Sequence, residues 1–459
     1  MNSKKRILVT TTTFPSFLKN DSTPPFVYEL SKRLIKKNDL EIIVSTPYVK
    51  NSKEYEERDN LKIHRYKYGF TALRAGAILP NIKKNKLLIF QVPLFFLFSF
   101  LSLVKLIKKE KIDIIHAHWI IPQGFLAVLY KRLFRKKDLK IICTVHGGDI
   151  FSLRDWFFTK IKKWTLDNVD EITVVSKEIK REVEKIFVIP TKANEVRVSG
   201  VEESANMLYL LLKNNFRNLF YLLTDPSARS YRRSVGMTKI RKGLTNLKIA
   251  PMGVDEKIFS PDEYDKNIKK KYNITGPFLL FVGRLVEKKG IKYAIAAMPI
   301  VLKKHPDVKF IIVGKGPLEN ELKKQVKKLN LENSIIFAGG VLNNKLPRYY
   351  ATADIFLGPS ITAKNGDSEG FGLTFAEALL CKCCVISSDL KAISDIIKNE
   401  KTGIQVDVKS MELFAEKIIE LIEDENKRKK LAGDGYEFVK NRFTWDISAE
   451  RYYDLIKDL

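Results

Sequence analysis

Cysteine is scarce in this sequence, and its placement argues against both a disulfide framework and a zinc site. The chain has four cysteines in 459 residues, and three of them lie in the run CKCC at 381–384. This spacing is too tight for a set of disulfides, and no second cluster or nearby histidine completes a zinc site. We therefore expect small buried thiols in a reducing compartment.

The sequence also lacks a long apolar leader and an excess of acid. The N-terminus, MNSKKRILVTTTTFPSF, has an apolar run of only three residues, so we expect no signal peptide and a cytoplasmic location. Lysine and arginine total 81 against 53 acidic residues, which gives a net charge of +28. Such a charge suits nucleic acid, an acidic membrane surface or a phosphorylated substrate, but a lysine-rich, well-solvated surface explains it equally well.

One apolar stretch raises the question of a membrane span. LLIFQVPLFFLFSFLSLV, at 87–104, reaches the lower edge of a spanning length. Pro93 is expected to break the helix early, and the strand-like run IDIIHAHW follows. We favour a core or surface helix over a true span, with peripheral membrane contact as a further alternative.

Short β-branched runs alternate with helical stretches along most of the chain, and the pattern restarts near residue 278. Near-continuous apolar strands separated by helices indicate parallel sheets covered on both faces, and the length exceeds what one core usually serves. We predict two doubly wound α/β domains, with ligands beyond the carboxyl ends of the strands. The expected strands are 6–13, 40–47, 61–66, 112–119, 140–147 and 171–177, then 278–284, 308–316, 334–340, 354–360 and 383–389.

Residues 196–247 do not fit this alternation and form a predicted insertion. The stretch 207–223 has the pattern of a largely apolar helix, and seven basic residues without an acid follow between Asp225 and Asp255. The segment could lie on an anionic membrane, but we favour a surface insertion.

The stretch FVGRLVEKKG, at 281–290, places two cations at a strand-to-helix turn. A strand is expected to end near Val282, and Arg284 and Lys289 follow before a helix at about Ile291. Two cations beside helix N-termini can grip a diphosphate.

The stretch GDSEGFGLTFAEALL, at 366–380, separates two acids by eight positions. With a helix from about Leu373, Glu369 stays in the loop and Glu377 lies more than one turn along, on the order of 10 Å away. One ligand meets both only if it carries hydroxyls at each end, as a nucleotide sugar does. The alternative for Glu377 is an exposed helix acid without a role.

These two stretches, with HAHW (116–119) and HGGD (146–149) upstream, resemble the family-4 retaining glycosyltransferases of the GT-B architecture. The hallmark of that family is Glu, seven residues, Glu, which Glu369 and Glu377 match. The resemblance implies an N-terminal acceptor-side domain at 1–255 and a nucleotide-sugar domain at 256–439. It also implies that the closing helix at 440–459 returns to the first domain and that the two domains face a central cleft.

The resemblance assigns a role to each candidate site residue. It implies that Glu369 contacts the donor sugar, that Glu377 binds the ribose hydroxyls, and that His146 contacts the sugar near the anomeric carbon. A lone histidine at a strand end is usually structural, and His118 is either structural or on the acceptor side. The remaining implied donor contacts are Arg284 and Lys289 with the diphosphate, Gly370, Phe371, Gly372 and Leu373 with the sugar and diphosphate, and Val341 beside the base.

By the same resemblance the enzyme transfers a hexose to a hydroxyl acceptor, such as a lipid-linked saccharide, by front-face attack. The departing phosphate would assist deprotonation of the acceptor. The chain has no Asp-x-Asp motif, so we expect metal independence and no cofactor besides the nucleotide sugar. The rival enzymes are a GT-B epimerase or phosphorylase. A basic nucleic-acid-binding protein is the rival outside enzymes, but we expect no nucleic acid, because no recognition motif is evident.

The sequence departs from the family pattern at several turns. The loop after the first strand contains Pro24-Pro25, and proline offers no N–H to a phosphate. The turn after CKCCVI reads Lys391-Ala392 where the family has two glycines, and the interdomain turn begins with Met252 where the family has Asn. These departures argue against backbone binding of phosphate after the first strand, and a weak or inactive enzyme is the alternative that they leave open.

Overall fold

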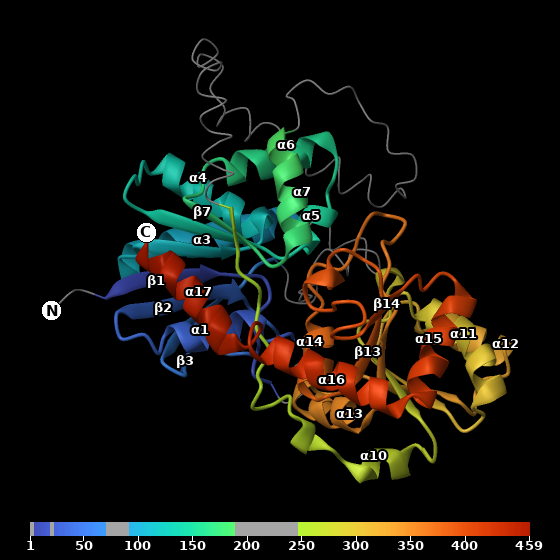
Figure 1. Ribbon diagram of the computed structural model, residues 1–459. Helices are drawn as coiled ribbons and strands as arrows, with labels where there is room; N and C mark the ends of the chain where they lie inside the picture. The colour runs from blue at the N-terminus through green and yellow to red at the C-terminus, as the bar shows by residue number, and fades with distance from the viewer. Residues whose placement is uncertain (1–3, 19–22, 70–90, 189–246) are drawn as a thin grey trace. The chain divides into compact units, whose positions relative to one another are not determined.

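The computed structural model describes residues 4–18, 23–69, 91–188 and 247–459, which form two α/β units (Figure 1). The first unit comprises Met1–Val175, Ile179–Ala250 and Tyr452–Leu459, and the second comprises Ser176–Glu178 and Pro251–Arg451. Each unit is built on its own mainly parallel sheet, which confirms the two doubly wound domains. The predicted apolar helix at 207–223 and the rest of the insertion up to residue 246 lie outside the described residues.

The sheet of the first unit has the strand order β3-β4-β2-β1-β5-β6-β7-β8. All neighbours are parallel except β3 and β4. Winding reverses between β1 and β5, so this is the topological switch point, where ligands of such sheets bind. The strands are β1 (Lys5–Thr10), β2 (Leu40–Pro47), β3 (Tyr55–Arg58), β4 (Leu61–Tyr66), β5 (Ile114–His118), β6 (Lys140–Val145), β7 (Glu171–Val174) and β8 (Leu247–Ile249).

Two helices of the first unit, α3 and α4, cover one face of this sheet. Leu106 of α3 and Val128 of α4 share a buried cluster with Leu8, Ile43 and Ile115 of the strands. The opposite face carries His116, whose ring contacts Tyr452 of α17. The helices with described bounds are α1 (Phe26–Leu34), α3 (Gln91–Glu110), α4 (Phe125–Leu133), α5 (Gly148–Phe151), α6 (Trp156–Leu166) and α7 (Lys177–Val188), with a π-helical turn η3 (Ile120–Gly124).

Helix α3 contains the long apolar stretch and corrects one expectation. Pro93 does not break the helix, which runs from Gln91 through the proline to Glu110 within the described residues. By length and composition alone α3 could span a membrane, a test that core helices also pass. One side of α3 is buried along its length, from Val92 through Ser99 to Ile107. This buried side is the packing expected of a core or surface helix.

The sheet of the second unit is entirely parallel, with the order β11-β10-β9-β12-β13-β14. The first and fourth strands of the unit, β9 and β12, are neighbours, and the switch point lies between them. The strands are β9 (Phe278–Val282), β10 (Lys309–Val313), β11 (Ile335–Gly339), β12 (Ile355–Gly358), β13 (Cys384–Ser388) and β14 (Ile404–Val406).

Alternate residues of β12 fill the two cores of this unit. Ile355 and Leu357 pack with α11, α12 and α15, which cover one face (Figure 1). Phe356 points to the other face, against Tyr350 of α13 and Phe375 of α14. The helices are α10 (Lys266–Lys271), α11 (Ile291–Lys304), α12 (Glu319–Lys328), α13 (Leu346–Thr352), α14 (Leu373–Leu380), α15 (Met411–Glu423), α16 (Glu425–Lys440) and α17 (Trp445–Lys457), with short 3-10 turns η5 (Pro261–Glu263), η6 (Glu287–Lys289), η7 (Asn343–Lys345) and η8 (Ile393–Asp395).

The residues of α17 divide between the two units, because its last turns belong to the first unit and its start to the second. The hydroxyl of Tyr452 donates a hydrogen bond to the carbonyl of Ala250 at 3.0 Å. At the other end, the amide of Trp445 donates to the carbonyl of Val254 at 3.2 Å. All four cysteines are buried and unpaired, as the sequence predicts.

Candidate functional site

The loops after β9 and β12 meet at the switch point of the second unit. Strand β9 ends at Val282, η6 ends at Lys289, and α11 begins at Ile291. Gly290 joins these helices with a φ of 62°, and a Cβ there would lie 1.8 Å from the carbonyl oxygen of Pro359, just past β12. The residue at 290 therefore has to be glycine for the two loops to touch.

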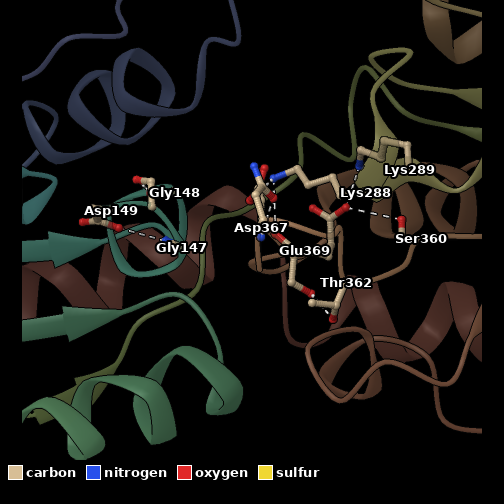
Figure 2. Close-up of polar contacts among 12 residues, drawn as sticks. Gly147, Gly148, Asp149, Lys288, Lys289, Ser360, Thr362, Asp367 and Glu369 are labelled. Carbon is tan, nitrogen blue, oxygen red and sulfur yellow. Dashed lines mark hydrogen bonds and ion pairs between the residues drawn. The ribbon is translucent and has the colours of Figure 1, made fainter. Parts of the chain in front are cut away.

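Lys289, predicted to bind the diphosphate of the donor, and Glu369, predicted to bind its sugar, form a direct ion pair. Lys289 Nζ lies 2.6 Å from Glu369 Oε2, and the two side chains are only 15% and 12% exposed. The hydroxyl of Ser360 approaches the same oxygen at 3.5 Å (Figure 2). Lys288 turns instead to Asp367, at 3.0 Å. The structure thus brings together a cation from the β9 loop and an acid from the β12 loop.

This pairing sets the charge of Glu369. Burial raises the pKa of the carboxyl, but the charges of Lys289 and Lys288 outweigh burial and leave the pKa below its ordinary value. Glu369 is therefore an anion at neutral pH. Arg284, two residues after the end of β9, is exposed and has no ion-pair partner within the described part of the chain. Its guanidinium is available to an anionic ligand.

The glycine-bearing loop leads directly into α14. Gly372, with a φ of 86°, precedes the first helical residue, Leu373, as predicted. A Cβ at Gly372 would meet the ring of Phe375 at 2.5 Å. The side chain of Phe371 packs against Phe443, so only its backbone could serve a ligand, and Gly370 precedes it in the loop. These amides lie at the N-terminus of a helix, where an anion is favoured.

Glu377 is neither fully exposed nor free. It lies in α14, and its Oε2 accepts a hydrogen bond from the hydroxyl of Tyr350 at 2.9 Å. Burial raises the pKa of Glu377 to about 7, although the Tyr350 hydrogen bond and the charge of Lys289 oppose this shift. Lys289 therefore influences both acids of the motif. Tyr350 could not be predicted from a sequence motif, because its contact with Glu377 joins separate helices.

The next strands along the sheet carry the predicted base-side residue. Val341 is half-buried and follows β11 by two positions. The loops after β10 and β11 are joined by a hydrogen bond from the amide of Gly314 to the carbonyl of Gly339 at 2.8 Å. Lys315 is exposed between them and was not predicted. The stretch VGKGP could have predicted it, because it places a cation just after a strand, as GRLVEKKG does.

At the switch point of the first unit the structure places aromatic rings. His118, the last residue of β5, has its Nδ1 2.9 Å from Nε2 of His146, which follows β6. The rings of Phe26 and Trp119 lie 5.1 and 4.9 Å from that of His146. Trp119 has a φ of 78°, an unusual backbone for a bulky residue. Phe26 and Trp119 were not predicted as site residues.

These imidazoles are neutral at physiological pH. Burial lowers the pKa of His146 to about 3, and the pKa of His118 lies well below its ordinary value, chiefly for the same reason. A neutral pair shares one proton in its hydrogen bond, so one ring donates and the other accepts. His146 can therefore meet a hydroxyl as donor or acceptor without carrying charge.

Asp149 and Lys162 carry charge in this region but are committed to the backbone. Asp149 accepts a hydrogen bond from the amide of Gly147 at 3.1 Å (Figure 2). It accepts a second one from the amide of Ile120 at 2.9 Å. Lys162 donates to the carbonyl of Ser152 at 2.6 Å. Burial raises the pKa of Asp149 and lowers that of Lys162 to about 8. Both residues hold the loop after β6 in place.

The departures from the family pattern lie at element boundaries. Pro24 and Pro25 directly precede α1, which begins at Phe26, and Lys391 and Ala392 lead into η8. Within the described ranges, no three His, Cys, Asp or Glu side chains converge as a metal site.

Two family models match the chain and together cover most of it. A model described as Glycosyltransferase Family 4 matches residues 25–201, and one described as Glycosyl transferases group 1 matches residues 265–438. The segment between them contains most of the predicted insertion.

Among curated relatives, a GDP-mannose-dependent alpha-(1-6)-phosphatidylinositol monomannoside mannosyltransferase of Mycobacterium tuberculosis is 30% identical over 46% of this chain. The match spans only 56% of that relative. The N-acetyl-alpha-D-glucosaminyl L-malate synthase of Bacillus anthracis is 22% identical over 84% of this chain and 87% of its own length.

A solved structure, the sucrose-phosphate synthase of Thermosynechococcus elongatus, superposes with a TM-score of 0.69 at 18% identity and covers 99% of both chains. The fold, the order of the motifs and both family models agree. The chain belongs to the family-4 glycosyltransferases of the GT-B architecture.

Proposed function

We propose that this protein transfers a hexose from a nucleotide-diphosphate sugar to a hydroxyl acceptor with retention of configuration. The observation that carries the proposal is the pairing of Lys289 with Glu369 at the switch point of the second sheet. Arg284 follows the same strand, β9, and has no ion-pair partner among the described residues. Cations and a polyol-binding acid at one ligand-binding edge suit a diphosphate joined to a sugar.

The donor would lie along the carboxyl ends of the second sheet. Arg284, Lys289 and the N-terminus of α14 would stabilise the negative charge that develops on the leaving diphosphate, which we propose needs no metal. Glu369 would accept hydrogen bonds from the hexose, and Glu377 would accept them from the ribose, with Val341 beside the base.

In the proposed reaction the acceptor hydroxyl attacks the anomeric carbon on the face that the diphosphate leaves. The bond from carbon to the phosphate oxygen breaks as the bond to the acceptor oxygen forms, and the acceptor proton passes to the departing phosphate. His146, which is neutral, would hold a sugar hydroxyl near this carbon without competing for that proton.

We further propose a lipid-linked saccharide as acceptor, reached at an anionic membrane surface from the cytoplasmic side. The net charge of +28 favours such a surface, and the name of the relative from M. tuberculosis gives it a phosphatidylinositol-based substrate.

A thermal-shift screen across UDP-, GDP- and ADP-sugars tests the donor site, because the true donor raises the melting temperature of the folded protein. Arg284→Ala and Glu369→Ala should each abolish most of this shift and reduce transfer about 100-fold, while their circular dichroism remains that of the wild type.

Near-normal turnover in both variants would refute the donor site. Turnover of donor alone into an epimer would instead favour an epimerase. Tight, steeply salt-dependent binding to duplex DNA or RNA would favour the nucleic-acid alternative.

A further inference from the structure

Helix α3 and the end of α4 expose a group of large apolar side chains on the first unit. Leu97 and Leu101 are each 50% exposed, and Phe98 is 39% exposed. Leu133 and Phe134, at the end of α4, are 52% and 41% exposed. No other described element exposes as many large apolar residues, and single exposed ones are ordinary.

Basic side chains border this apolar group. Lys105 lies one turn beyond Leu101, and Nζ of Lys108 lies 5.6 Å from the centre of the Phe134 ring, which brings the ends of the two helices together. The unpaired cations are Lys105, Lys108, Arg132, Arg135, Lys136 and Lys137, none of which has an ion-pair partner among the residues the structure describes.

We infer that this α3–α4 face, meaning the five apolar side chains and six cations just named, docks the protein on an anionic lipid bilayer. Apolar side chains one helical turn from a row of cations match the layering of a bilayer surface, where acyl chains lie beneath anionic headgroups. An acidic protein would pair with the cations but would not require so many apolar side chains, and nucleic acid would not use them.

The packing of α3 favours a helix that lies on the membrane over one that crosses it. Phe95 packs against Tyr66 and Tyr68, and Leu103 shares the sheet core with Leu8. Ser102 and Ser45 are joined by a hydrogen bond of 3.2 Å. A spanning α3 would have to abandon these contacts along its whole length, whereas surface docking uses only the side that the protein leaves exposed.

The inference rests on the membrane part of the proposed function but can fail separately from it. Vesicle binding is measured without donor or acceptor, so loss of transfer does not affect the result. Absence of vesicle binding would leave the donor site untouched.

The test is co-sedimentation of the full chain with phosphatidylcholine vesicles that contain about one third phosphatidylglycerol, against pure phosphatidylcholine. L97S/F98S/L101S should weaken binding about tenfold or more at every salt concentration, because it removes the inserted side chains. R135E/K136E/K137E should remove the preference for phosphatidylglycerol. The matched control is K324E/K327E/K328E on α12, which makes the same charge change on the second unit and should alter binding less than about twofold.

A labelled variant reports contact directly. Because the four native cysteines are buried, Leu101→Cys provides an accessible thiol for an environment-sensitive dye. Its emission should shift to the blue on anionic vesicles. Each variant is first checked for an unchanged thermal transition, so that a misfolded protein is not scored.

Three outcomes would overturn the inference. One is binding of both α3–α4 variants to anionic vesicles as strongly as the wild type binds them. Another is equal loss in the α12 control, which would indicate diffuse charge attraction. The third is retention of the protein in membranes after carbonate extraction, which would indicate a spanning helix.

Discussion

The two sheets have the same order of winding, but their switch points present opposite chemistry. In the second unit Lys289, Glu369 and Arg284 bring charges to the carboxyl edge. In the first unit the corresponding edge presents the neutral rings of His118 and His146.

The difference lies in how each unit uses its charges. Asp149 and Lys162 of the first unit form hydrogen bonds with backbone groups, whereas Lys288 and Lys289 of the second unit pair with acids on a neighbouring loop. Topology therefore fixes where a ligand can bind, and the residues just past each strand decide whether it is an anion or a neutral polyol.

Removing Lys289 should have the largest effect on activity, because the second site would lose a cation and Glu369 would lose its ion-pair partner. We expect Lys289→Ala to lower kcat/KM on the order of 100- to 1,000-fold. Lys303→Ala, an exposed lysine of α11, serves as control and should stay within about twofold. Equal activity of the two variants would remove Lys289 from the site.

Changing the histidines should have a smaller effect, because a neutral hydrogen bond contributes less than a charged one. We expect His146→Ala to lower kcat/KM about tenfold and His118→Ala somewhat less. Because the pKa of His146 is about 3, kcat/KM of the wild type should show no imidazole titration between about pH 5.5 and 8.5. This range brackets the ordinary imidazole pKa of about 6.5. A step near pH 6.5 that disappears in His146→Ala would show that this ring carries charge during turnover.

Substitution of Glu377 should have the smallest effect on activity, but it should change the pH dependence of stability and of nucleotide binding most clearly. Its folded pKa of about 7 exceeds the ordinary value of 4.5, so its contribution to stability is complete below 4.5 and is lost as pH rises through 7. Glu377→Gln should flatten that part of the stability profile. If the carboxylate accepts ribose hydroxyls, nucleotide binding should strengthen severalfold across pH 7 and release protons in calorimetry.

Tyr350→Phe is the matched variant for this experiment. The hydroxyl of Tyr350 lowers the pKa of Glu377, so its removal should move the midpoint upward without abolishing it. A midpoint that is unchanged in both variants would assign the titration to another group.

Local patterns predicted most elements and the neighbourhood of the site. The apolar runs correctly predicted β9 and β12. Helices begin at Ile291 and Leu373, after the turns 284–289 and 370–372, as expected. Where a strand is buried on both faces, its apolar run is long enough to be recognised in the sequence.

Short or tertiary features could not be predicted in this way. Strand β3, YEER, is a charged edge strand, and β8 and β14 have three residues each. The Lys289–Glu369 contact links positions 80 residues apart. Pro93 was misjudged, because the described helix α3 continues from Gln91 through the proline to Glu110.

The ion pair at the second switch point also bears on product release. A bound donor would offer the ammonium a phosphate and the carboxylate a sugar hydroxyl, and the pair would open. After transfer of the hexose, Glu369 would lack that partner and could pair again with Lys289, from which it lies 2.6 Å away in this structure. The nucleotide diphosphate product would then compete with the Glu369 carboxylate for the Lys289 ammonium, and this competition would favour release of the product.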